Sequence, residues 1–114
     1  MTTVLLVESH AESARRYADH LERAGFRVEA VTGEGERENL RPDLVIISVP
    51  SLDRSQLRVV ANGRPVPKIA LSSEPSDAAR GEEFGCAAVL VRPVMYDDLV
   101  TEVRRVLKTI ELPA

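Results

Sequence analysis

The sequence predicts an α/β fold, a doubly wound (βα)5 three-layer sandwich in which one parallel sheet lies between two layers of helices. Four short runs are apolar at nearly every position, as in parallel strands that helices cover on both faces; they span residues 4–7, 44–49, 69–71 and 87–91. Segments with helical spacing of apolar residues alternate with these runs. Because crossovers between parallel strands are right-handed, this alternation predicts helices on both faces of the sheet.

An amphipathic helix and an edge strand are predicted after the first strand. Apolar side chains recur there at helical spacing: Ala14, Tyr17, Ala18 and Leu21. Gly25 suits the end of this helix because glycine tolerates a positive φ. Residues 26–31 then alternate between apolar and polar, which is typical of a strand with one exposed face.

The middle of the chain has weaker helical patterns. Residues 33–41 contain Leu40 as their only apolar side chain, so we expect a short second helix that is the most mobile part of the domain. A third helix is predicted from Leu52 to the turn at Asn62 and Gly63. A short fourth helix is predicted over residues 76–85, interrupted by Gly81.

The last helix, after Pro93, has the clearest pattern. Its apolar face comprises Leu99, Val103, Val106, Leu107 and Ile110. Asp97 and Asp98 lie in its first turn and basic residues lie later, an arrangement that the helix dipole favours.

Length and composition indicate one domain, residues 1–114, with a core over about residues 3–110. The C-terminal ELPA is compatible with a natural end or with a following output domain. A net charge of −3, with scattered basic residues, argues against direct nucleic-acid binding. The aliphatic runs are far shorter than the roughly 20 residues that cross a bilayer, so we expect no membrane insertion and a cytoplasmic location. Cys86 is the only cysteine, which excludes an internal disulfide and a cysteine-based zinc site.

Polar residues follow four of the predicted strands, and the carboxyl ends of parallel strands form one crevice. These residues are Glu8, Ser9, Ser48, Ser72 and Arg92. The motifs VLLVES, GFRVEAVTGEG, RPDLVIISVP, VPKIALSS and FGCAAVLVRPV occur in this order. With them the chain resembles the response-regulator receiver domains of bacterial two-component signal transduction, over about residues 3–110. The resemblance implies a flavodoxin-like five-stranded sheet with the strand order 2-1-3-4-5.

The chain departs from the family at the positions that carry its chemistry. Typical members have an acidic pair, a phosphoacceptor Asp, a Ser or Thr, and a Lys-Pro; these positions hold Glu8 and Ser9, Ser48, Ser72, and Arg92 and Pro93. The aromatic residue that usually accompanies the hydroxyl switch is replaced by Val89. A Ser hydroxyl without a base is a poor nucleophile, and Mg²⁺ prefers carboxylate oxygens. We therefore expect a degenerate pocket that has lost phosphorylation and Mg²⁺ binding, and no other cofactor.

Arg92 is expected to pair with Glu8 and to fill the space of the metal and the phosphate, because a guanidinium suits bidentate pairing with a carboxylate. His10 and His20 are expected on the surface, without other ligands at metal-binding spacing, so no metal site is predicted. Ser72 and Ser73 are either remnants of the switch or ordinary hydroxyls that cap a loop.

Two functions of different classes fit this pattern. The first is a phosphorylation-independent pseudo-receiver, a protein–protein interaction module in bacterial signalling that binds a partner or forms a homodimer. In relatives the interaction face is formed by the fourth helix, the fifth strand and the fifth helix; here it includes Val89, Met95, Tyr96, Arg104 and Arg105. In a simpler interpretation, Met95 and Tyr96 only shape the turn into the last helix. The second function is sensing of a small anion or nucleotide at the strand ends, with Arg92 and the serines as donors. The sequence has no nucleophile with a base and no cofactor fingerprint, so an enzyme is not expected.

Overall fold

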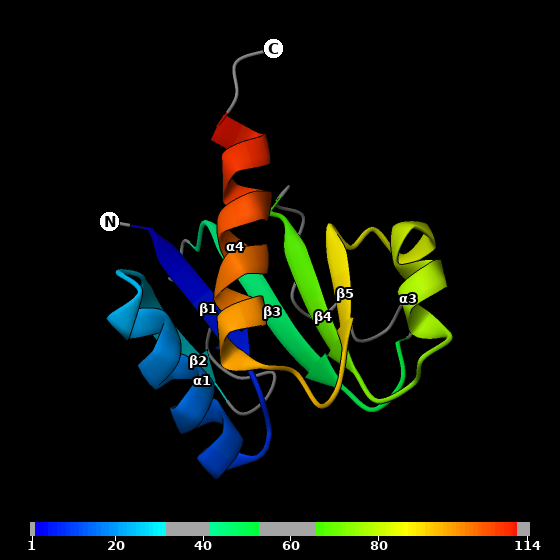
Figure 1. Ribbon diagram of the computed structural model, residues 1–114, viewed down its shortest axis with the longest axis horizontal. Helices are drawn as coiled ribbons and strands as arrows, with labels where there is room; N and C mark the ends of the chain where they lie inside the picture. The colour runs from blue at the N-terminus through cyan, green and yellow to red at the C-terminus, as the bar shows by residue number, and fades with distance from the viewer. Residues whose placement is uncertain (1, 32–41, 53–65, 112–114) are drawn as a thin grey trace.

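The computed structural model describes residues 2–31, 42–52 and 66–111, without the side chains of residues 110 and 111. Its sheet contains β1 (Thr3–Val7), β2 (Arg27–Val31), β3 (Leu44–Val49), β4 (Lys68–Ser72) and β5 (Ala88–Val91). All neighbouring strands are parallel, in the order β2-β1-β3-β4-β5, so their carboxyl ends meet at one edge (Figure 1). The predicted fold class and strand order are confirmed.

Burial falls from the centre of the sheet to its edges. β3 pairs with β1 and β4, and Ser48 is its only residue that is not fully buried. β2 and β5 contain no fully buried residue, because each has a neighbouring strand on one side only. The alternating sequence of β2 therefore predicted its edge position correctly.

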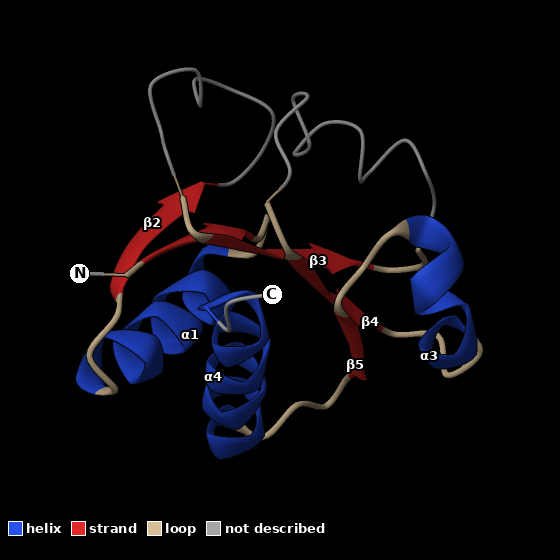
Figure 2. Ribbon diagram, turned by 90° about the horizontal axis from the view of Figure 1, so that it is seen from above, coloured by secondary structure: helices blue, strands red, loops and turns tan. Residues whose placement is uncertain are grey.

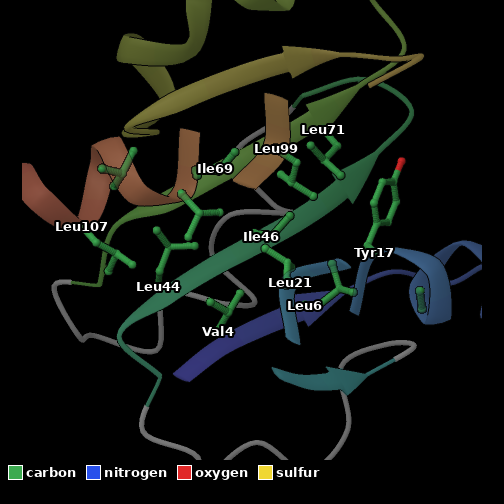
Figure 3. Packing of buried hydrophobic residues seen from close by; sticks show 13 residues of the cluster. Val4, Leu6, Tyr17, Leu21, Leu44, Ile46, Ile69, Leu71, Leu99 and Leu107 are labelled. Atoms are coloured by element: carbon green, nitrogen blue, oxygen red, sulfur yellow. The ribbon is translucent and has the colours of Figure 1, made fainter. Parts of the chain in front are cut away.

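Two long helices, α1 (Ala11–Arg23) and α4 (Tyr96–Glu111), lie side by side on one face of the sheet (Figure 2). The predicted apolar faces point inward; the buried side chains include Ala14, Tyr17, Leu21, Leu99, Val103, Val106 and Leu107. They pack on strand residues such as Leu6, Ile46 and Ile69 in one cluster (Figure 3). Tyr17 belongs to this cluster, but its hydroxyl oxygen points away from the other labelled side chains (Figure 3). Gly25 follows α1 with φ of 104°, as predicted for a helix C-terminus.

A short helix, α3 (Asp77–Arg80), continues as the 3-10 helix η1 (Gly81–Phe84) and packs beside β5. A second apolar cluster lies on this side of the sheet, with Leu5, Val45, Ile47, Val49, Leu52 and Ala70 as its buried members. The predicted interruption at Gly81 is confirmed, because the α-helix gives way to the 3-10 helix there. A Cβ added to Gly81 would lie 2.4 Å from Val89 Cγ2, so this backbone touches β5 where a side chain has no room.

The expectations for residues 33–41 and for the helix from Leu52 to Gly63 fall largely outside the described residues. Leu52 itself is buried in the second cluster. No helix in the described ranges is long and apolar enough to cross a membrane.

Candidate functional site

Most of the predicted site residues lie at the carboxyl edge of the sheet. Glu8 follows β1, Ser48 lies near the end of β3, Ser72 ends β4 and Arg92 follows β5. Strand register brings these positions together, since Val49 pairs with Ser72 and Ser72 pairs with Val91. The structure therefore brings these four residues to the same edge of the sheet.

Arg92 extends across the ends of β3 and β4. Its backbone N–H donates to the Ser72 carbonyl at 2.8 Å, which holds the start of its loop against β4. Its Nε and Nη2 donate to Ser73 Oγ at 3.1 and 3.0 Å. Nη1 donates to Ser48 Oγ, and Nη2 also donates to the Val49 carbonyl. The guanidinium is therefore held by neutral oxygens from two strand ends.

Glu8 is 6% exposed and does not pair with Arg92. Its Oε2 accepts the His10 backbone N–H at 3.0 Å, and its own backbone N–H donates to the Val31 carbonyl. The expected Glu8–Arg92 ion pair is thus wrong. The physical reason is that each charge finds closer partners on its own side: the first turn of α1 for Glu8, and the serines after β3 and β4 for Arg92.

A cleft of about 410 Å³ lies between these two groups. Its lining comprises Glu8, Ser9, His10, Ser13, Tyr17, Ser48, Val49, Pro50 and Arg92. The expectation that Arg92 fills this space is therefore not met, because the guanidinium lines the cleft and leaves it open.

The pKa of the Tyr17 phenol depends on the two charged residues of the cleft. Burial, and next the negative charge of Glu8, raise the pKa of the Tyr17 phenol above its ordinary value of 10.0, whereas the positive charge of Arg92 acts in the opposite direction. The phenol therefore lies within the field of both charged residues.

Ser72 belongs to a separate buried network. Its hydroxyl donates to Asp77 Oδ2 at 2.6 Å and accepts the Glu74 backbone N–H at 3.0 Å. Asp77 Oδ2 also accepts the Leu52 backbone N–H at 2.7 Å. The hydrogen bond from Ser72, and then that from Leu52, lower the pKa of Asp77 below its ordinary value of 3.8. This carboxylate ties the loops after β3 and β4 to the start of α3.

The residues expected on the interaction face differ in their exposure and in their contacts. Val89 packs against the second apolar cluster. Tyr96 packs on α1, where its ring stacks on His20 with 3.9 Å between centroids and meets the Tyr17 ring edge-on. Arg104 Nη2 donates to the Ala24 carbonyl at the C-terminus of α1, at 3.2 Å. Met95, which is 69% exposed, Arg104 and Arg105, which pairs with Glu102, are the exposed members.

Three residues that shape the site and its surroundings were not predicted from the sequence. His10 caps α1, because its Nδ1 accepts the Ser13 backbone N–H. Asp77 was not singled out, and Tyr17 was predicted only as part of the apolar face of α1. His10 carried no capping signal, because the preferred N-cap residues are Ser, Thr, Asp, Asn and Gly. The roles of Asp77 and Tyr17 had no signal, because they depend on contacts between distant segments.

The cleft does not suit a magnesium ion. Glu8 is the only carboxylate among its described lining residues, and Arg92 contributes a fixed positive charge. In the described ranges, no group of three or more His, Cys, Asp or Glu side chains is arranged to hold a metal.

Comparisons with known proteins place the fold. No protein-family model and no curated protein matches the chain. The signal receiver domain of a signal transduction histidine kinase from Syntrophus aciditrophicus is similar, with 28% identity, a TM-score of 0.79, and coverage of 100% of this chain and 96% of that chain. A CheY-like response regulator receiver domain protein from Methanospirillum hungatei has 21% identity, a TM-score of 0.84 and 97% coverage of both chains. The Francisella response regulator 1452 receiver domain has 21% identity, a TM-score of 0.83, and coverage of 97% and 100%. The chain therefore has the fold of response-regulator receiver domains.

Proposed function

We propose that this chain, with the fold of a receiver domain, is a phosphorylation-independent pseudo-receiver that works through protein–protein contacts and catalyses no reaction. The observation that carries the proposal is at the end of β3, where Ser48 stands in place of a phosphoacceptor Asp and its hydroxyl accepts a hydrogen bond from Arg92. An acyl phosphate requires a carboxylate nucleophile. A guanidinium remains protonated at neutral pH and cannot act as the base that a Ser nucleophile needs.

The arrangement around Ser72 supports a fixed conformation. A hydroxyl switch must be free to turn toward a phosphoryl group, but the Ser72 hydroxyl is engaged by the buried Asp77 carboxylate. Val89 stands where relatives place the aromatic partner of that switch, and its side chain lies against Gly81. The Ser72 hydroxyl is therefore not free to turn, and the aromatic side chain of the switch is missing. Partners would then recognise a single conformation of the surface.

The proposed contact surface is the open part of the α3, β5 and α4 side. Met95 is 69% exposed at the entry to α4, and β5 is an edge strand whose residues are half-buried. An exposed flexible apolar side chain beside an edge strand is a favourable anchor for a protein partner or a second copy of the chain. Tyr96 stacks on His20 of α1, which narrows the predicted face to Met95, Arg104, Arg105 and β5.

The test of phosphorylation independence is an amide NMR titration with Mg²⁺ and beryllofluoride. The wild-type chain should show no saturable shifts at Glu8, Ser48 or Ser72. A triple variant, Ser9→Asp, Ser48→Asp and Arg92→Lys, restores the groups typical of the family and serves as the positive control. Saturable shifts in the wild-type chain at these residues would contradict the proposal.

The test of the contact surface is sedimentation equilibrium of the wild-type chain and of Met95→Asp, alone and with candidate partner proteins. Association should weaken in Met95→Asp and persist in the control Thr101→Asp, an exposed α4 position. Equal association in all three proteins would remove this surface from the proposal.

The cleft favours a second candidate function, the sensing of a small anion or nucleotide at the strand ends. Its specific support is the Arg92 guanidinium, which lines the cleft together with Ser48. Phosphate, sulfate or a nucleotide should then raise the melting temperature, because a ligand that binds the folded state stabilises it. Two of the serines that were expected to donate to the ligand have other partners in the structure. The Ser72 hydroxyl donates to Asp77, and the Ser73 hydroxyl accepts a hydrogen bond from Arg92.

A further inference from the structure

We propose that the cleft at the carboxyl edge of the sheet binds a small zwitterion, an amino acid or short peptide, with its ammonium group beside Glu8 and its carboxylate beside Arg92. The inference rests on the ligand-sensing function proposed second above, and it changes the class of ligand. It does not depend on the interaction-module proposal, and it requires neither a phosphoryl group nor a metal.

The two charged residues of the cleft are both fixed, and they are not neutralised by each other. Glu8 is almost fully buried and is oriented by the His10 backbone N–H. Arg92 is oriented by Ser48, Ser73 and the Val49 carbonyl. Both line the same cleft, yet no ion pair joins them. Opposite charges that are held apart by their own neighbours form a site that is already organised for a dipolar ligand.

Each charged group retains bonding capacity for a ligand. A guanidinium has five N–H donors, and the bonds to described residues use four of them, one on Nε, two on Nη2 and one on Nη1. The remaining N–H belongs to Nη1, which bonds the cleft residue Ser48. On Glu8, Oε2 accepts from His10, and Oε1 has no hydrogen-bond partner among the described residues. No described side-chain oxygen or nitrogen is both fully buried and without a partner, so Oε1 retains some exposure, and Glu8 lines the cleft.

Charge balance selects the ligand class. Glu8 and Arg92 give the lining a net charge of zero when His10 is neutral, so a simple anion meets the Glu8 carboxylate and a simple cation meets the Arg92 guanidinium. A zwitterion satisfies both groups. Serine hydroxyls and the Tyr17 phenol also line the cleft and supply neutral donors and acceptors. The cleft volume, about 410 Å³, lies within the range of small-molecule sites.

The test is an amide NMR titration of the intact chain with each of the twenty L-amino acids and with dialanine. For the probe with the largest response, its N-acetyl form and its carboxamide form each remove one charge. We expect shifts around Glu8, Ser13 and Arg92 that saturate with a dissociation constant of about 1 mM, a value suited to so small a ligand. Both modified forms should bind about tenfold more weakly.

Variants separate recognition from folding. Glu8→Gln and Arg92→Gln should each weaken binding about tenfold, because each loses one charge-assisted hydrogen bond. Asp19→Asn and Arg23→Gln make the corresponding changes at an exposed ion pair on α1 and should leave binding unchanged. A well-dispersed spectrum of each variant establishes that it is folded. Arg92→Lys retains the positive charge and should bind better than Arg92→Gln.

The outcomes distinguish this inference from the function on which it rests. Saturable binding of a zwitterion that is lost in both cleft variants supports it. Binding of phosphate or a nucleotide without binding of any zwitterion overturns it and leaves anion sensing standing. No response to any probe overturns both. Equal binding by the N-acetyl form and the parent compound also overturns it, since Glu8 would then make no contact with an ammonium group.

Discussion

The hydroxyl of Ser72 donates a 2.6 Å hydrogen bond to the buried carboxylate of Asp77, five residues further along the chain. The same carboxylate oxygen accepts the Leu52 backbone N–H, so the loops after β3 and β4 are both bonded to one atom at the start of α3. A buried carboxylate with charge-assisted bonds is well satisfied, but removal of one donor leaves it partly unsatisfied. The contact that occupies Ser72 is therefore also a structural contact of the domain.

Ser72→Ala should lower the free energy of unfolding by about 1–3 kcal/mol, the usual cost of leaving a buried polar group without its partner. Ser76→Ala is the matched control, because Ser76 is exposed and its side chain makes no capping bond. Urea unfolding of the three proteins measures the difference. Equal stability of Ser72→Ala and Ser76→Ala would show that the Asp77 network does not hold the fold.

The lowered pKa of Asp77 should make the free energy of unfolding decrease in acid. Its folded-state pKa is lowered below 3.8 by Ser72 and Leu52, so its stabilising contribution is complete above 3.8 and is lost as the pH falls from there through the lowered value. Asp77→Asn should therefore flatten the dependence of unfolding free energy on pH in this acidic window. Asp98→Asn, at an exposed position in the first turn of α4, is the control. Identical pH profiles for both variants would contradict the assignment.

Gly81→Ala should destabilise the domain by about 1–3 kcal/mol, because the new methyl group would overlap Val89 Cγ2. Val89→Ala removes the obstructing atoms, so the double variant should be less destabilised than the sum of the two single variants. A double-mutant cycle by chemical denaturation measures this coupling. Strict additivity would mean that η1 and β5 are not in direct contact at these residues.

The stacked pair His20 and Tyr96 should couple α1 to the start of α4. Their ring centroids are 3.9 Å apart with an interplanar angle of 10°, and aromatic pairs contribute about 0.5–1.5 kcal/mol beyond area burial. A double-mutant cycle with His20→Ala and Tyr96→Ala should give a coupling in this range. Tyr96→Phe should retain it, because the ring and not the hydroxyl makes the stack. Absence of coupling would return Tyr96 to the candidate interaction face.

The pKa of Tyr17 tests the electrostatics of the cleft. Glu8→Gln should lower this pKa, because it removes a negative charge that opposes the phenolate, and Arg92→Gln should raise it, because it removes a positive charge that favours the phenolate. NMR titration of the tyrosine rings in a Tyr96→Phe background isolates Tyr17. Shifts of the same sign in both variants would show that the phenol does not lie between opposite charges.

Sequence patterns were sufficient for the framework because they reflect local periodicity and burial. Apolar runs predicted β1, β3, β4 and β5, and alternation predicted β2 as an edge strand. Helical spacing predicted the buried faces of α1 and α4. The residues at the strand ends followed directly, since parallel strands bring their carboxyl ends to one edge whatever side chains follow them.

By itself, the sequence determined the fold class and the set of groups at that edge: one carboxylate, one guanidinium and several hydroxyls. Only the tertiary structure decided which of these groups are bonded to each other. Arg92 donates to Ser48, 44 positions earlier in the sequence, and Asp77 accepts from Leu52, 25 positions earlier. Glu8 instead accepts the backbone N–H of His10, the residue that caps α1. Charge complementarity alone favoured a Glu8–Arg92 pair. The nearer donors and acceptors decided otherwise, because a side chain bonds the partners that its backbone position and rotamer bring within about 3 Å.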